Sequence, residues 1–120
     1  MSTAHRIHHD LYRADKVLKD PGDGKTIRFN EDLQICEMVS TTTETRTLAA
    51  PTKPGIRAVI RMLTDGGDIV VTAAEGLDTG LDTVATFADA SDLLSLISVS
   101  LTATTCRWEI LEGNVGVDIS

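Results

Sequence analysis

The chain has 120 residues, with 11 basic and 18 acidic side chains that give a formal net charge of −7 at pH 7. This length fits a single domain that can bury a modest core without a metal or a disulfide. An acidic body repels phosphate backbones, and no apolar run approaches the roughly 20 residues that cross a bilayer, so we expect neither nucleic acid nor membrane as a partner.

The first 24 residues differ from the rest, because their charges cancel and they hold all three histidines. No apolar stretch follows the first basic residues, so we expect no secretory signal and place synthesis in a cytoplasm. The spacing of Ile7, Leu11, Ala14 and Leu18 fits one face of a helix, while Tyr12 and Val17 fall off it. Turn formers fill 20–24. The pattern predicts an extended or partly helical N-terminal arm over 1–24 that becomes ordered when it docks. Packing of this arm on its own domain is the open alternative.

Strand patterns begin at residue 26. The stretch 26–30 alternates apolar and polar residues, and a second strand is predicted at 33–39 with Leu33, Ile35, Glu37 and Val39 on one face. The threonine-rich tract 40–45 fits an exposed edge strand or a loop. A short strand at 46–48 then leads into 49–55, where two prolines and a glycine predict an ordered corner.

The next stretch, 56–63, places Arg57 and Arg61 on the face opposite Ile56, Ala58, Ile60 and Met62. The turn at 64–68 contains Gly66 and Gly67. Because glycine reaches positive φ angles, this turn predicts a hairpin between 56–63 and the strand at 69–73.

The remaining elements are a loop over 75–82, strands at 83–87, 93–101 and 106–111, and a last short strand after a turn at 113–114. A turn at 88–92 and a connection at 102–105 separate these strands. Seven to nine short strands about ten residues apart predict an all-β domain over 25–120. We expect an antiparallel β-sandwich or a small, jelly-roll-like barrel.

Catalysis is not expected, because the β body has no histidine to serve as a base. Cys36 and Cys106 lie in apolar stretches and are interpreted as buried free thiols, with a disulfide between them left open. His5, His8 and His9 have only Asp10 nearby and do not complete a zinc set. The acidic turns at 65–68 and 78–82 lack the frame of a calcium loop, so no metal or cofactor is expected.

The aromatic residues of the body are few, and Phe29, Phe87 and Trp108 are interpreted as core. Trp108 shares a strand face with Cys106 and Ile110, which favours burial. An exposed Trp108 acting as a binding hot spot is the alternative.

Four stretches of the chain carry distinctive motifs, which are 45–55 with its TLAAPTKPG corner, 65–72 with DGGDIVVT, 86–90 with TFADA, and 107–111 with RWEIL. Together these stretches resemble small virion-associated proteins of tailed bacteriophages. Such motifs occur in this order in that group, and the resemblance covers about residues 20–115. The chain departs from the pattern by one glycine fewer at 66–67 and by Ser91 where the turn often has glycine.

The resemblance implies a capsid decoration or cement protein on the outer surface of the virion. Its implied partners are the major capsid protein and further copies of itself, as a homotrimer. The arm would dock on the capsid or on a neighbouring subunit. The candidate partner-binding residues are Ile7, Leu11, Tyr12, Ala14 and Leu18 in the arm and Arg57 and Arg61 in the body.

Three other functions compete with this interpretation. A tail-fibre or baseplate-associated binding module is the first alternative. A small hydrolase is disfavoured by the lack of histidine in the body, and a sugar-binding or host-surface module would need exposed aromatic residues.

Overall fold

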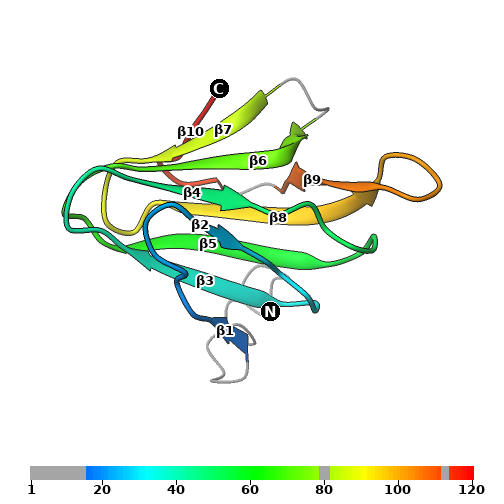
Figure 1. The fold of residues 1–120 in the computed structure, drawn as a ribbon, viewed down its shortest axis with the longest axis horizontal. Helices are drawn as coiled ribbons and strands as arrows, with labels where there is room; N and C mark the ends of the chain where they lie inside the picture. The colour runs from blue at the N-terminus through cyan, green and yellow to red at the C-terminus, as the bar shows by residue number, and fades with distance from the viewer. Residues whose placement is uncertain (1–15, 79–81, 112–113) are drawn as a thin grey trace.

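The computed structural model describes residues 16–78, 82–111 and 114–120, which are built mainly from β-strands (Figure 1). The strands are β1 (Val17–Leu18), β2 (Lys25–Ile27), β3 (Gln34–Val39), β4 (Glu44–Leu48), β5 (Arg57–Thr64), β6 (Ile69–Leu77), β7 (Asp82–Phe87), β8 (Leu93–Ser100), β9 (Cys106–Ile110) and β10 (Asp118–Ile119). The predicted all-β class is therefore confirmed. Across these described ranges, no helix is long and apolar enough to cross a membrane.

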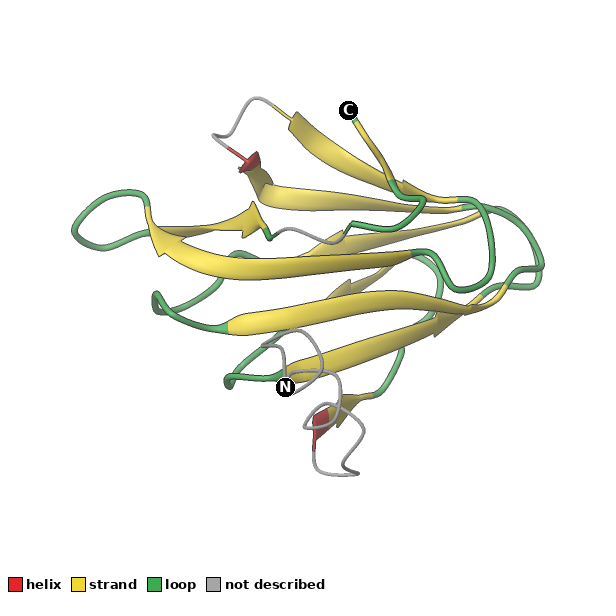
Figure 2. Cartoon of the chain, turned by 180° about the vertical axis from the view of Figure 1, so that it is seen from behind, coloured by secondary structure: helices red, strands yellow, loops and turns green. Residues whose placement is uncertain are grey.

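The first six strands alternate between two halves of one curled sheet, which forms a half-barrel (Figures 1 and 2). We call β1, β3, β5, β8 and β9 the first half-sheet, and β2, β4, β6, β7 and β10 the second half-sheet. The halves join where Leu77 of β6 pairs with Trp108 of β9. Both halves contribute side chains to one core cluster.

The sheet is mixed, which corrects the predicted antiparallel arrangement. β1, β3 and β5 run parallel to one another, as do β2, β4 and β6. Antiparallel pairing joins β5 to β8, β8 to β9, β6 to β7, and β7 to β10. Parallel neighbours need a crossover between them, and here the crossover is a strand of the other half-sheet instead of a helix.

Three short connecting turns carry the chain from the first half-sheet to the second, at residues 19–24, 40–43 and 65–68. The turn at 65–68 is one of them, so the hairpin predicted there is wrong, because β5 pairs with β3 and β8 while β6 pairs with β4 and β7. The true hairpins join β6 to β7 and β8 to β9.

Gly66 and Gly67 are needed for close packing between turns, not for a positive φ angle. A Cβ atom on Gly66 would lie 2.3 Å from the carbonyl oxygen of Ser40, and one on Gly67 would lie 2.3 Å from the carbonyl carbon of Thr42. The Ser40 hydroxyl donates to the Gly67 carbonyl at 2.6 Å and accepts from the Gly66 amide at 3.1 Å. The turns at 40–43 and 65–68 are therefore stacked with no space for a side chain between them.

Several element boundaries differ from the sequence prediction. β6 continues to Leu77, so the first part of the loop predicted at 75–82 is strand. The tract 40–45 is divided between the turn at 40–43 and β4, which begins at Glu44. The alternation predicted for β3 and β5 is confirmed, because Cys36, Met38, Ala58, Ile60 and Met62 all lie in the core.

Trp108 lies in the core, as predicted, and is 1 % exposed. Its ring meets Phe29 edge to face, with ring centroids 5.7 Å apart. Its indole nitrogen donates to the Ala49 carbonyl at 2.9 Å, which ties the corner at 49–55 to β9. Cys36 and Cys106 are buried and free, as expected. Burial raises the pKa of the Cys36 thiol to about 12.

Candidate partner-binding surface

Arg57 and Arg61 lie on the outer face of the first half-sheet, which is the face that points away from the core. Their neighbours Ala58, Ile60 and Met62 point into the core, and side chains alternate along a strand. The prediction that the two arginines share a face is therefore confirmed, with Val59 between them on the same side.

Arg57 forms a bidentate ion pair with Asp32, which lies just before β3. Its Nη2 is 2.7 Å from Asp32 Oδ2, and its Nε donates to Oδ1 at 3.2 Å. The Arg57 backbone amide also donates to Oδ1, at 2.7 Å. These hydrogen bonds from Arg57 hold the pKa of Asp32 below its usual value. Both side chains remain more than a third exposed, so the pair can be reached by a partner.

Arg61 pairs with Glu37 on the neighbouring strand β3, and the two residues are directly opposite in the parallel register. The distance between Arg61 Nη1 and Glu37 Oε2 is 2.9 Å, and Arg61 Nη2 donates to Ser91 Oγ at 3.3 Å. Arg107 and Glu109 form a third pair on β9, at 2.8 Å. This outer face thus carries arginines and carboxylates in pairs, and each partly exposed pair contributes at most about 1 kcal/mol to stability.

Leu18 is the arm candidate that the structure describes. It lies on β1, which pairs with β3, and its side chain packs against the core cluster of its own body. The segment is therefore extended at Val17–Leu18. The other arm candidates lie outside the described residues: Ile7, Leu11, Tyr12 and Ala14.

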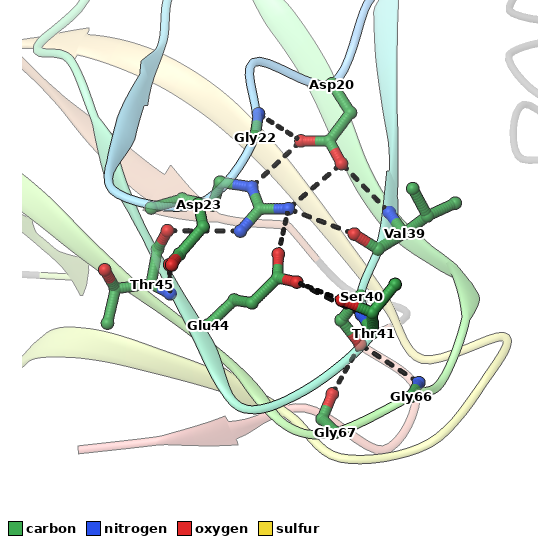
Figure 3. Close-up of polar contacts among 11 residues, drawn as sticks. Asp20, Gly22, Asp23, Val39, Ser40, Thr41, Glu44, Thr45, Gly66 and Gly67 are labelled. Carbon is green, nitrogen blue, oxygen red and sulfur yellow. Dashed lines mark hydrogen bonds and ion pairs between the residues drawn. The ribbon is translucent and has the colours of Figure 1, made fainter.

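A buried arginine that the sequence analysis did not single out, Arg46, bonds to Asp20 in the turn at 19–24 and to Val39, which precedes the turn at 40–43. Figure 3 shows both of these partners together with Glu44 and Thr45. The side chain of Arg46 on β4 is 0 % exposed. Its Nε and Nη2 donate to the two carboxylate oxygens of Asp20 at 2.9 and 3.0 Å. Nη2 also lies 3.0 Å from Glu44 Oε1 and donates to the Val39 carbonyl, while Nη1 donates to the Thr45 carbonyl. We call Asp20, Glu44 and Arg46 the Arg46 cluster.

The charges of the Arg46 cluster stabilise one another. Burial acts to raise the pKa of Asp20, but hydrogen bonds from Arg46 and from the amides of Val39 and Gly22 outweigh it and lower that pKa. Burial likewise acts to lower the pKa of Arg46, and its bonds to Asp20 and Glu44 outweigh it and raise that pKa. Asp20 and Arg46 therefore stay ionised in the folded protein near neutral pH.

The Arg46 cluster fixes the start of the described chain to the body. Asp20 reaches from the turn at 19–24 to β4 through Arg46 and to the end of β3 through the Val39 amide. In the same turn, Asp23 accepts from the Thr45 amide at 2.9 Å. The part of the predicted arm that the structure describes, residues 16–24, is thus held on the body.

The alternation of residues along β4 could have predicted that Arg46 is buried. Glu44, Arg46 and Leu48 alternate with Thr45 and Thr47, and the first three are buried while the threonines are exposed. A buried Glu and Arg two residues apart on one strand face require charged partners. The partner Asp20 lies 26 residues away, and sequence spacing alone does not identify it.

In the part of the chain that the structure describes, no group of three or more histidine, cysteine, aspartate or glutamate residues is placed to hold a metal ion. Comparisons with protein families, curated proteins and solved structures found no match to this chain.

Proposed function

We propose that the chain is a structural virion protein that binds the outer capsid of a tailed bacteriophage and stabilises contacts between capsomers. In this proposal the protein acts as a homotrimer, its main partner is the major capsid protein, and it performs no catalysis. The observation that carries the proposal is the set of four sequence motifs that resemble those of virion-associated phage proteins.

Each of these motifs has a physical role in the fold, which supports their use as markers of a related architecture. The Ala49 carbonyl of the TLAAPTKPG corner accepts the hydrogen bond of Trp108, which belongs to the RWEIL motif. The DGGD motif supplies the glycines that let two turns stack. After the TFADA motif, Asp92 accepts hydrogen bonds from the amides of Ala88 and Asp89.

The construction of the body fits a cement role. Parallel ladders, stacked turns and the buried Arg46 cluster join segments that are distant in sequence, so a pull on one strand is shared by several neighbours. The net charge of −7 suits a protein that must remain soluble outside a shell packed with DNA. Arg57 and Arg61, with their carboxylate partners, would form polar contacts to the capsid or to a second subunit.

The proposal is tested by adding the purified protein to capsids assembled without it. We expect saturable binding over the whole shell and a rise in the temperature at which the capsids release DNA. Multivalent attachment of a trimer predicts much tighter binding than a monomeric variant would show. Sedimentation equilibrium of the free protein checks the trimer independently.

Two variants sharpen this experiment. Replacement of Arg61 by Glu, which places like charges opposite Glu37, should weaken binding to the capsid, whereas Thr72→Glu on the outer face of the second half-sheet should not. Binding confined to the tail would favour the tail-fibre or baseplate alternative, and absence of binding to either would refute the proposal.

A further inference from the structure

The outer face of the first half-sheet is apolar at its centre. Ile35 and Val59 form a small cluster that is separate from the main core, and Leu33 and Leu93 pack against it. Ile35 is 2 % exposed and Val59 is 5 % exposed. These values are those of core residues, although both side chains point away from the core.

The outer face of the second half-sheet provides the comparison. Thr47 on β4 is flanked by β2 and β6, as Ile35 on β3 is flanked by β1 and β5. Thr47 and its neighbour Thr72 are nevertheless exposed. A flanking strand on each side therefore does not bury an outward side chain in this fold. Leu93 lies on β8 of the first half-sheet and Leu33 directly precedes β3, and both pack against Ile35 and Val59.

The described part of the chain reaches this face at residue 16, and residues 1–15 precede it in the sequence. Val17 pairs with Ile35, and its half-exposed side chain lies on the same face. Lys16 Nζ donates to the Asp32 carbonyl at 3.3 Å, next to the Asp32–Arg57 pair. A segment that precedes Lys16 therefore starts at the edge of the Ile35–Val59 cluster.

The length of residues 1–15 is sufficient to cross the face. Five strands spaced by about 4.8 Å give a width of about 19 Å. Fifteen residues span about 22 Å as a helix and about 50 Å when fully extended. The segment is therefore long enough to cover the cluster, and as a helix it presents Ile7, Leu11 and Ala14 on one face with His9 on the other.

The chemistry of the segment matches that of the face. Ile7, Leu11 and Ala14 provide the apolar stripe, and Arg6 and Arg13 balance Asp10 and Asp15. The positive and negative charges of the face also balance each other, because each of its arginines is paired with a carboxylate. Contact between the two would be driven by apolar burial and would depend little on salt.

We propose that residues 1–15 dock on the outer face of the first half-sheet of the same chain and cover Ile35 and Val59. This inference does not rest on the capsid assignment. For a capsid protein it means that a partner must either displace the segment or bind the side of it that faces solvent.

The test uses the full chain with 13C-labelled Ile, Leu and Val methyl groups. We expect nuclear Overhauser effects between the methyl groups of Ile7 or Leu11 and those of Ile35 and Val59. Replacement of Leu11 by Asp should shift the Ile35 and Val59 methyl resonances to their positions in a chain that lacks residues 1–15. His9→Asp is the matched control, because it adds the same charge off the apolar stripe, and it should leave those resonances in place.

A mixture of labelled and unlabelled chains distinguishes docking within a chain from docking between chains. The proposal predicts that isotope-filtered spectra of the mixture contain no cross-peaks between the segment and the face. Cross-peaks in that mixture would assign the face to a second copy and overturn the proposal. Absence of contacts in the fully labelled chain, with equal effects of Leu11→Asp and His9→Asp, would overturn it as well.

Discussion

Arg46 holds the start of the described chain, the turn at 19–24, against the body. Its guanidinium is fully buried and bonds to two carboxylates and two backbone carbonyls. A bidentate pair of this kind holds both planar groups in one orientation. Within the described residues, every buried polar side-chain atom has a hydrogen-bond partner. A cluster satisfied in this way favours one arrangement of the turn at 19–24 over others.

Replacement of Arg46 by Met should lower the free energy of unfolding by about 3–5 kcal/mol, because it leaves Asp20 and Glu44 buried without a counter-charge. Urea titration followed by tryptophan fluorescence provides the measurement. Arg107→Met is the matched control, since its partly exposed pair with Glu109 should contribute at most about 1 kcal/mol. Equal losses for the two variants would contradict the structural role assigned to Arg46.

Asp20 should make the protein sensitive to acid. Its folded-state pKa lies below the usual value of 3.8, so the unfolded chain takes up a proton first as the pH falls. The stability that Asp20 contributes is thus fully present above its unfolded pKa and is lost as the pH falls through its folded pKa. Asp32 has a lowered pKa too, but it is more exposed, so its effect should be smaller.

The measurement is the difference in free energy of unfolding between the natural protein and Asp20→Asn, taken from about pH 6 down to about pH 2. We expect this difference to narrow at the acid end, and to narrow less for Asp32→Asn. A difference for Asp20→Asn that does not change with pH would mean that its carboxylate is not stabilised in the folded state.

At the scale of the elements, the stacked connecting turns explain why parallel strands fit into so short a chain. Each of the three connecting turns takes four to six residues. The turns at 40–43 and 65–68 bond to one another through Ser40, and the Glu44 amide donates to the Asp68 carbonyl. The edge strands β1, β2 and β10 are only two or three residues long. Short edges leave few free backbone groups for unwanted pairing with other chains.

Replacement of Gly66 by Ala should destabilise the protein by about 1–3 kcal/mol, because the new Cβ overlaps the backbone of the stacked turn at Ser40 and that backbone must move. Thermal or urea unfolding measures the loss. Asp68→Ala in the same turn is the control, since its side chain is exposed and only its carbonyl is used. A Gly66→Ala variant as stable as the control would show that the turns can separate without cost.

The sequence identified most strands and their buried faces, but not their partners. Alternation along 33–39 and 56–63 correctly separated Cys36 and Ile60 from Glu37 and Arg61, because a strand repeats every two residues. The same alternation is compatible with a parallel or an antiparallel neighbour. The hairpin predicted at 64–68 was wrong, because two glycines fit a close approach between two turns as well as they fit a tight hairpin turn.

The candidate surface was predictable in part. The shared face of Arg57 and Arg61 follows from their spacing of four along a strand. Their partners Asp32 and Glu37 lie more than twenty residues away and are set by the parallel pairing of β3 with β5. The Arg46 cluster was missed because its three members come from two segments that only the fold brings together.

At the scale of the whole molecule, the two outer faces have different character. The second half-sheet presents exposed threonines such as Thr45, Thr47 and Thr72. The first half-sheet presents a covered apolar centre bordered by ion pairs. The proposed attachment to a shell on one side, with solvent on the other, would use such an asymmetry, and the proposal assigns the contacts to the first half-sheet.

The most direct test of the proposed function is the number of copies of this chain in phage particles that carry it, measured by quantitative mass spectrometry against the most abundant shell protein. A cement protein should be present in a nearly fixed ratio to the shell protein, with hundreds of copies in each particle. A handful of copies in each particle, or none, would contradict the account.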